Sequence, residues 1–359
     1  MSNTWNNLKQ NIKNGLEGKN QGIPFRGFTT LSDYVCNIQP GRYDLIFAAS
    51  GNGKTSFVNG AYVYGAIKYL QENPNHINKL KIIYFSLELT AEEQLGKYMC
   101  SRLWEDHGIL ISYVKLLSKG KNKCDPKILP LLDVYEEEMK EIEDKYIDFH
   151  YYTDPKSFIS TLVKYAQTIG ELVTDDDGNV IQFISNDPDL ITLIVIDHIG
   201  LVSLGELPDI KKAMDSISKS CVTFRNIFRF SPVVISQINR SSEQMDRRGD
   251  GDNWMPMSSD TKNSGNLIED CNTAIGIASP FALMIENCLG YDITKFKDRY
   301  RLAKIVKNRD GPTGQICSFS FIGEIGQFRQ LKGYEEYLNK KPQEIADVDN
   351  YYINLHSND

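Results

Sequence analysis

The residues with the clearest chemical signature lie at positions 43–62, in the sequence YDLIFAASGNGKTSFVNGAY. The apolar residues 45–47 predict a buried strand, the glycines that follow predict a tight turn, and a helix is expected from Lys54 onward. Such a turn presents unpaired backbone N–H groups and the positive end of the helix dipole, which together suit a polyphosphate. Lys54 would add a positive charge for the β- and γ-phosphates, and the Thr55 hydroxyl is placed to bind Mg²⁺.

This stretch predicts a P-loop for ATP or another NTP, with one departure. Ala48 stands where the motif has its first glycine. The alternative is an accidental turn, and the strand before the motif and the helix after it argue against that. The residues expected to contact the nucleotide are Ser50, Gly51, Asn52, Gly53, Lys54, Thr55 and Ser56.

Two carboxylates and one amide are expected at the ends of strands. Glu88 follows the apolar residues 81–87, and Asp197 ends the most apolar strand of the chain, residues 190–197. Ligands of open α/β sheets bind at this edge. Asp197 matches a Walker B carboxylate that holds Mg²⁺ through water, and the alternative is a simple cap of the strand end. Gln237 follows the apolar residues 232–236 and would sense a γ-phosphate or orient the attacking water, or else cap a loop.

Composition and charge limit the class of protein. The 359 residues, 41% of them hydrophobic, suffice for one large α/β domain with appendages or for two small domains. The net charge of −7 argues against a generally basic surface that coats nucleic acid, but not against nucleic acid held in a narrow channel. The chain has no run of 18 apolar residues and no signal-like N-terminus, and its seven cysteines are scattered. We expect a soluble cytoplasmic protein (host cytoplasm if viral), with reduced thiols, no zinc site and no membrane partner.

The first 20 residues place Trp5, Leu8, Ile12 and Leu16 on one face of a predicted helix. This apolar stripe would either pack on its own domain or dock on a neighbouring subunit, and the residues alone leave both open. Elsewhere the pattern predicts helices from Pro155 to about residue 169 and over 208–230, and a surface hairpin at 172–184. Surface insertions are expected at 106–148 and 281–300.

Two segments near the C-terminal end carry further candidate groups. Residues 239–263 have little periodicity and a slight excess of acidic side chains, which is typical of a functional or disordered loop. Residues 300–307 predict a strand that ends in Lys307-Asn308-Arg309, and residues 316–321 predict its antiparallel return. The two cations are expected in the exposed tip of this hairpin, either as functional groups or as solvated charges.

Taken together, these segments resemble the RecA-like motor domain of DnaB-type replicative helicases, which form hexameric rings. The resemblance covers about residues 22–328 in the family's motif order, and its most specific motifs are VVISQINRSSEQ, SSDTKNSGNLIEDCN and IVKNRDGPTG. It implies a RecA-like P-loop NTPase of the α/β class, with a mostly parallel central sheet flanked by helices and antiparallel strands at the C-terminal edge. The expected units are an N-terminal helix and linker (1–21), the ATPase domain (22–332) and a polar tail (333–359), without the family's usual N-terminal domain.

The resemblance also implies roles for individual residues. Glu88 would be the general base for the attacking water, and Gln237 a γ-phosphate sensor. Lys307 and Arg309 would act in trans on the nucleotide of the neighbouring subunit, with Arg309 as an arginine finger. The residues implied in contacts with single-stranded DNA are Arg240, Lys262, Asn263 and Gly265.

We therefore expect a replicative DNA helicase of a compact phage type, which translocates on single-stranded DNA and unwinds duplexes with ATP or another NTP and Mg²⁺. Its expected partners are single-stranded DNA, further copies of itself in a homohexameric ring, and a primase or helicase loader. Two alternatives stay open. One is a RecA-like strand-exchange ATPase that forms filaments, and the other is a nucleotide-gated DNA-binding factor that regulates or loads. The motif FSLELTAEEQL and the Lys307-x-Arg309 hairpin favour the helicase.

Overall fold

A nine-stranded sheet forms the centre of the molecule. The structure is a computed structural model, and it describes residues 3–238, 254–261 and 266–331. The strand order is β13-β12-β11-β8-β1-β7-β6-β2-β3. The strands from β8 to β3 run parallel, and β11, β12 and β13 join antiparallel at one edge, which confirms the expected α/β fold class. The strands are β1 (Asp44–Ala48), β2 (Lys79–Ser86), β3 (Ile147–His150), β6 (Leu190–Asp197), β7 (Ser231–Gln237), β8 (Thr273–Ala278), β11 (Tyr300–Asn308), β12 (Ile316–Ile322) and β13 (Gln327–Gln330).

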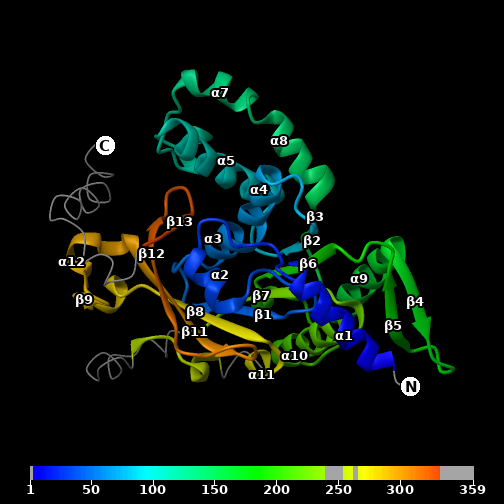
Figure 1. Cartoon of the computed structure of the whole chain (residues 1–359). Coiled ribbons are helices and arrows are strands. Elements are labelled where there is room, and N and C mark those ends of the chain that lie inside the picture. The colour runs from blue at the N-terminus through cyan, green and yellow to red at the C-terminus, as the bar shows by residue number, and fades with distance from the viewer. Residues whose placement is uncertain (1–2, 239–253, 262–265, 332–359) are drawn as a thin grey trace.

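Helices cover both faces of the sheet (Figure 1). Parallel strands that are apolar on both sides need cover on both sides, and β1 is buried along its whole length. Two apolar clusters, one for each face, form the core. The helices of the first face are α2 (Thr29–Val35), α3 (Lys54–Val58), η1 (Asn59–Val63), α4 (Tyr64–Glu72) and α5 (Ala91–His107). Those of the second are α9 (Pro155–Ile169), α10 (Ile210–Thr223), η5 (Phe224–Phe228) and α11 (Leu267–Asp270).

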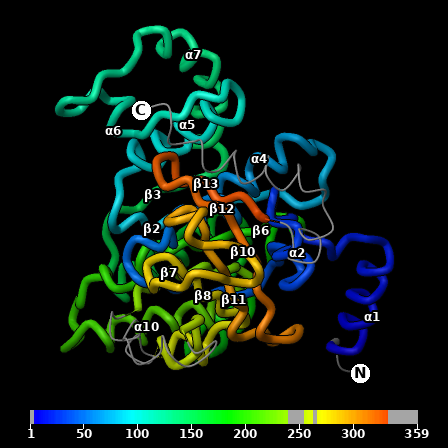
Figure 2. The backbone as a smooth tube through the Cα atoms, turned by 90° about the vertical axis from the view of Figure 1, so that its left-hand side faces the viewer, coloured from blue at the N-terminus to red at the C-terminus, as the bar shows by residue number. Residues whose placement is uncertain are grey.

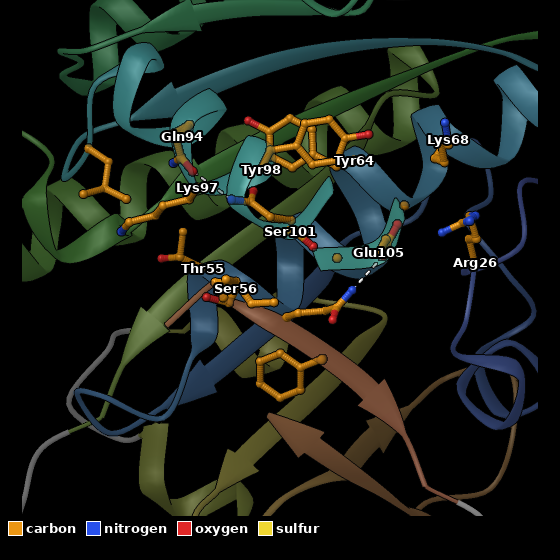
Figure 3. Close-up of a pocket in the computed structure, with 18 of the residues that line it drawn as sticks. Arg26, Thr55, Ser56, Tyr64, Lys68, Gln94, Lys97, Tyr98, Ser101 and Glu105 are labelled. Carbon is orange, nitrogen blue, oxygen red and sulfur yellow. Dashed lines mark hydrogen bonds between the residues drawn. The ribbon is translucent and has the colours of Figure 1, made fainter. Parts of the chain in front are cut away.

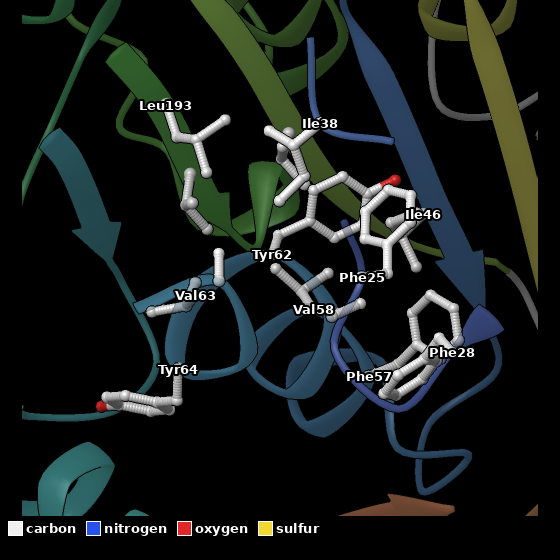
Figure 4. Packing of buried hydrophobic residues seen from close by; sticks show 14 of the residues in the cluster. Phe25, Phe28, Ile38, Ile46, Phe57, Val58, Tyr62, Val63, Tyr64 and Leu193 are labelled. Atoms are coloured by element: carbon white, nitrogen blue, oxygen red, sulfur yellow. The ribbon is translucent and has the colours of Figure 1, made fainter. Parts of the chain in front are cut away.

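Aromatic rings fix the helix that follows the P-loop. Phe57 of α3 lies edge-on to Phe28 and to Phe328 of β13, with ring centroids 5.6 and 5.5 Å apart. Tyr62 packs against Phe25 at 4.9 Å in the same cluster (Figure 4). Such pairs contribute about 0.5–1.5 kcal/mol each beyond the area that they bury. The helix is therefore held by both the entry segment and the C-terminal strands.

Residues 108–146 form an arch above α5, at the top of Figure 1. The arch contains α6 (Tyr113–Leu116), η2 (Pro126–Ile128), α7 (Leu129–Asp133), α8 (Glu136–Glu141) and η3 (Ile142–Tyr146). The sequence predicts a solvated insertion here, and the structure differs. Ile111, Ile128 and Tyr135 are buried with Leu103 of α5 in an apolar cluster of their own. Widely spaced apolar residues can build such a cluster without any visible periodicity.

The second predicted insertion, residues 281–300, also has a small core. It contains η10 (Phe281–Leu283), a hairpin of β9 (Asn287–Cys288) and β10 (Tyr291–Asp292), α12 (Ile293–Phe296) and η11 (Lys297–Arg299). Tyr291 and Ile293 are buried there, so the segment is more than surface. The hairpin expected at 172–184 is confirmed as β4 (Gly170–Thr174) and β5 (Val180–Ser185).

α1 (Asn3–Leu16) projects from the body of the molecule (Figure 2). Trp5, Leu8, Ile12 and Leu16 are 57%, 48%, 53% and 86% exposed. The interpretation that this stripe packs on its own domain is therefore wrong, because no element among the described residues covers it. No helix in the described part of the chain has the length and apolar character needed to cross a membrane.

Candidate nucleotide-binding site

The P-loop connects β1 to α3, as the sequence predicts. Gly51 and Gly53 have φ angles of 82° and 85°, which residues with a Cβ rarely adopt. A Cβ at Gly53 would also come within 3.0 Å of the Phe328 ring. Ala48, which replaces the first glycine of the motif, is the last residue of β1 and pairs in register with Gln237. Its backbone continues the strand, so that position does not require glycine.

The seven predicted phosphate-binding residues lie in this turn and in the first turn of α3. The Lys54 ammonium donates to the Ala49 carbonyl at 3.1 Å, so it lies over the loop. Burial lowers the pKa of Lys54, and the carboxylates of Glu88 and Asp197 oppose that shift. The Thr55 hydroxyl donates to Asp197 Oδ1 at 3.0 Å. The fold thus joins the P-loop to the end of a strand that begins more than a hundred residues later.

Asp197 is the most buried acid of the site. It ends β6 in register with Ser86 of β2, and 1% of its surface is exposed. Burial raises the pKa of Asp197 to about 6, although the Thr55 hydroxyl favours the charged form. A bound cation would stabilise such a carboxylate.

The donor set fits Mg²⁺. A threonine hydroxyl and a carboxylate are oxygen ligands, and Mg²⁺ takes few protein ligands beside substrate phosphates and water. In the described ranges, no group of three or more histidine, cysteine, aspartate or glutamate side chains could hold a metal ion.

A buried polar cluster behind Asp197 was missed by sequence reasoning. The Tyr84 hydroxyl of β2 donates to Asp197 Oδ2 at 3.2 Å and also lies 3.2 Å from Asn59 Oδ1. Gln94 of α5 donates to the Tyr84 hydroxyl at 3.2 Å and accepts from the Asn59 amide at 2.7 Å. The only signal in the sequence is a tyrosine within an apolar strand, and a packed core residue gives the same signal.

Glu88 and Gln237 lie at the same edge of the sheet as the P-loop. Glu88 follows the end of β2 by two residues, and Gln237 is the last residue of β7; both are exposed. The backbone N–H of Leu87 donates to the Asp197 carbonyl at 2.8 Å, which fixes the chain just before Glu88. The structure therefore brings together the strand ends that the sequence singled out.

A pocket of about 210 Å³ opens beside the P-loop helix (Figure 3). Thr55 and Ser56 form one side, and Gln94 and Tyr98 of α5 form another. The Tyr98 ring stacks on Tyr64 with centroids 4.3 Å apart. The pocket thus combines aromatic and polar surface next to the phosphate loop. The turn before β13 and its first residues complete the lining with Ile325, Gly326, Gln327 and Phe328.

Lys307 and Arg309 lie at the opposite edge of the sheet. The residue between them pairs with Thr273 at the start of β8, and Thr273 pairs with Asp44 at the start of β1. Lys54 follows the other end of β1. A strand of this length, at about 3.3 Å per residue, separates the two edges by roughly 15 Å. These cations are therefore too far from their own P-loop to contact a nucleotide bound there.

The prediction that both cations occupy an exposed hairpin tip is wrong for Lys307. It lies within β11, in register with Ala274 of β8, and its ammonium donates to the carbonyls of Ile268 and Glu269 at 2.5 and 2.8 Å. Arg309 is exposed and donates to the same Glu269 carbonyl at 2.9 Å. The last carbonyls of a helix lack intrahelical partners and accept readily from cations, so both side chains rest on the end of α11.

The residues implied in DNA contacts lie outside the described residues; they are Arg240, Lys262, Asn263 and Gly265. Residues directly before and after positions 262–265 contact other elements of the fold. Thr261 is buried at the end of η9 (Ser258–Thr261), and the N–H of Asn266 donates to Asp215 of α10 at 2.9 Å. The next residues form α11, which holds Lys307 and Arg309.

Comparison with known protein families finds a similarity in one part of the chain. Residues 178–330 match the family model described as the DnaB-like helicase C terminal domain. The match includes Asp197, Gln237 and the segment with Lys307 and Arg309. This part of the chain, less than half of its length, is therefore similar to the DnaB-like helicase C terminal domain, the family that the sequence motifs resemble. Comparison with curated proteins gives no match.

Solved structures share the RecA-like fold. The structure described as the ATPase domain of G40P has a TM-score of 0.68 and 18% sequence identity, over 92% of this chain and 100% of that chain. A DnaB-like replicative helicase, described with its interactions with primase, has a TM-score of 0.63 and 19% identity. That likeness covers 87% of this chain, which spans 64% of the length of the other. At these identities the similarity concerns the fold.

Proposed function

We propose that this chain is the motor of a replicative DNA helicase, a ring that uses ATP or another NTP with Mg²⁺ to move along single-stranded DNA and unwind duplexes. The observation that carries the proposal is the separation of two half-sites on one subunit. Lys54, Thr55 and Asp197 gather at one edge of the sheet, and Lys307 and Arg309 lie at the other. In related NTPases an arginine finger contributes roughly 10³–10⁵ in rate, and a ring would bring both halves together.

The first half-site would bind and activate the nucleotide. The P-loop N–H groups and Lys54 would hold the β- and γ-phosphates. Thr55 and Asp197 would hold Mg²⁺, whose chemical contribution is to neutralise phosphate charge in the transition state. Glu88 would accept a proton from the attacking water, and Gln237 would orient that water. The pocket between α3 and α5 would take the nucleoside.

The second half-site would act on the neighbouring subunit's nucleotide. Burial and the nearby positive charges of Arg309 and Arg225 lower the pKa of Lys307, although Cys271 and Asp270 oppose this. Clustered cations of this kind repel one another, and a phosphate group would relieve the repulsion. The geometry therefore supports an anion contact on this edge, supplied from outside the subunit.

Assembly would use α1. A second exposed apolar surface is a groove of about 580 Å³ between α5 and the arch. In Figure 1 the arch lies at the end of the molecule away from α1, so α1 does not reach the groove of its own subunit. A helix that fits a different surface on the next subunit makes a heterologous contact, which is the kind that closes rings. Apolar residues that line the groove are Leu95, Met99, Leu116, Leu132 and Met139.

Charge substitutions on α1 test this mode of assembly. Leu8→Glu together with Ile12→Glu should raise the protein concentration needed for assembly at least about tenfold, because burial of an unpaired carboxylate costs more than 1.4 kcal/mol. Gln10→Glu with Asn14→Glu is the matched control, since it adds the same charges at the same spacing on the opposite, polar side of the helix. Native mass spectrometry in ATP measures both. An equal loss of mass in the two variants would show that the stripe is not the docking surface.

The proposed DNA contacts come from the segment between β7 and α11. Arg240, Lys262, Asn263 and Gly265 would contact phosphates through the backbone and polar side chains, so binding would be independent of base sequence. A primase or a helicase loader is a further proposed partner. Single-stranded DNA should stimulate NTP hydrolysis; hydrolysis that ignores DNA would favour a regulatory or loading factor instead.

Mixed assemblies test whether the nucleotide site is shared. Lys54→Ala subunits lose their own site but still offer Arg309 to a neighbour. Lys54→Ala/Arg309→Ala subunits lose their own site and also lack the arginine that a neighbour would use. In equal mixtures with wild-type subunits, independent sites in a closed ring predict about one half of wild-type hydrolysis for the single variant and about one quarter for the double variant. Coordination between sites would lower both values and keep their order. Coincident mixing curves would overturn the trans assignment.

A further inference from the structure

The two residues that flank Arg309 are held by one buried guanidinium. Asn308 and Asp310 alternate with Lys307 and Arg309 along the chain. The Arg42 guanidinium donates to Asn308 Oδ1 at 3.1 Å and to Asp310 Oδ2 at 2.6 Å. The backbone N–H of Asp310 donates to the same Asn308 oxygen at 3.2 Å. Arg42 therefore contacts both residues that flank Arg309.

Contacts with the first residues of β1 and β8 fix the Arg42 side chain. It lies just before β1 and is 6% exposed. It donates to Thr273 Oγ1 at 2.5 Å and to Asp44 Oδ1 at 3.3 Å. The Asp44 carboxylate also accepts from the hydroxyl of Tyr62, in the helical segment η1 that continues the P-loop helix, at 3.1 Å. Charge-assisted hydrogen bonds with little water nearby are strong and directional, so this arrangement is rigid.

The segment 307–310 has supports on two sides. On one side, Lys307 and Arg309 rest on the carbonyls of α11. On the other, the Asn308 amide donates to the Tyr34 carbonyl at 3.0 Å and accepts from Arg42. Lys307 and Arg309 share the Glu269 carbonyl, whereas Asn308 and Asp310 share the Arg42 guanidinium, so the two pairs lie on opposite sides of the segment. To fix residues 308 and 310 is therefore to fix the direction in which residues 307 and 309 project.

We propose that Arg42 is a positioning residue for the trans half of the nucleotide site: by holding Asn308 and Asp310, it sets the backbone that carries Lys307 and Arg309 toward the neighbouring subunit. The inference rests on the proposed function, because it requires that these cations act in trans. Arg42 acts through the segment and contacts no nucleotide. A misplacement of about 1 Å at a catalytic site can cost about 10²-fold in rate, so the loss of this support is measurable.

Arg42→Lys separates positioning from folding. Lysine keeps the positive charge beside Asp44, but one ammonium cannot reach the set of acceptors that the planar guanidinium spans. In assemblies in which every subunit carries Arg42→Lys and keeps Lys54, kcat should fall by about tenfold to 10²-fold, with KM for ATP within about twofold of wild type. Asn308→Ala is the second variant, because it removes an acceptor of Arg42 without burying a charge. It replaces Arg42→Lys in the test if the lysine variant does not fold.

The decisive measurement is a mixing curve on the Lys54→Ala background. In equal mixtures with wild-type subunits, Lys54→Ala/Arg42→Lys should allow about half of the hydrolysis that Lys54→Ala allows, close to the value for Lys54→Ala/Arg309→Ala. A curve that overlays that of Lys54→Ala would overturn the role of Arg42 and leave that of Arg309 intact. If the Arg309 double variant itself overlays Lys54→Ala, the trans assignment fails and the inference fails with it.

Arg102→Lys is the matched control for a buried arginine. Arg102 is 7% exposed and pairs with Glu105, Asp106 and Glu138, on α5 and α8. On the Lys54→Ala background it should leave the mixing curve unchanged, because none of its partners belongs to the trans segment. A curve as low as that of Arg42→Lys would show a general effect of buried arginine substitution and would overturn the inference.

Discussion

Replacing Asp197 with asparagine should stabilise the nucleotide-free protein while it abolishes hydrolysis. In the folded chain, burial raises the pKa of Asp197 to about 6, against an ordinary value of 3.8. The folded state therefore binds the carboxyl proton more tightly than the unfolded state does. The stability that this proton contributes is complete below about pH 4 and is lost as the pH rises through 6. At neutral pH the folded protein holds a buried charge that asparagine would not have.

The magnitude follows from the size of the shift. About two pKa units correspond to about 3 kcal/mol of unfolding free energy at pH 7.5. Asparagine keeps one acceptor oxygen and loses one of the two hydrogen bonds that Thr55 and Tyr84 donate to Asp197, which costs about 1 kcal/mol. Asp197→Asn should therefore raise the unfolding free energy by about 2 kcal/mol. At pH 5 the gain should shrink to less than about 1 kcal/mol, because the wild-type carboxyl is then mostly protonated in the folded state.

Urea unfolding without nucleotide, at one fixed subunit concentration, measures this difference at both pH values. Asp154→Asn is the control of opposite sign, because hydrogen bonds from Ser157 lower the pKa of Asp154. The charged form of that carboxyl stabilises the fold at pH 7.5, so asparagine there should not raise the unfolding free energy. With ATP and Mg²⁺ present, Asp197→Asn should be less stable to urea than the wild type, because only the wild type gains the full free energy of nucleotide binding. An Asp197→Asn protein that is less stable than wild type at pH 7.5 would refute the reasoning.

Three further substitutions test single contacts of the site. Lys54→Ala should remove NTP hydrolysis, and undiminished turnover would contradict the P-loop assignment. Tyr84→Phe should weaken Mg²⁺-dependent binding of a fluorescent nucleotide about tenfold but leave binding in EDTA unchanged, because the lost hydroxyl orients Asp197; equal losses in both buffers would show a general packing defect. Gly53→Ala should weaken nucleotide binding more than Gly51→Ala, since a Cβ meets an aromatic ring only at the former; the reverse order would contradict the loop geometry.

The position of the P-loop half of the candidate site could be predicted because its signals are local. A P-loop is a contiguous motif between a strand and a helix, and Asp197 ends an apolar run that is long enough to identify as a core strand. The carboxyl ends of parallel strands meet at one edge of the sheet, so strand-end residues come together whatever the order of the strands. This physical rule predicts that Glu88 and Gln237 lie at the edge of the P-loop, and the structure has both strand ends at that edge.

The contacts that could not be predicted depend on pairing between distant segments. Arg42 follows a turn, where a cation is usually solvated, and its burial depends on Asn308, 266 residues later. Lys307 was expected in a hairpin tip, but an irregularity in register after Ile305 carries it along β8 to the end of α11. The residue at which two strands shift register leaves no pattern in the local sequence. The same holds for a hydrogen-bond acceptor that lies far away along the chain.

Strand separation in a forked DNA duplex tests the central claim most directly. A fork with single-stranded tails and a fluorophore–quencher pair reports unwinding by the whole chain in ATP and Mg²⁺. We expect the wild-type protein to separate the strands as an oligomer and the Lys54→Ala variant to leave them paired. DNA-stimulated hydrolysis without strand separation, together with open filaments on DNA in electron micrographs, would contradict the helicase assignment and indicate a RecA-like filament protein.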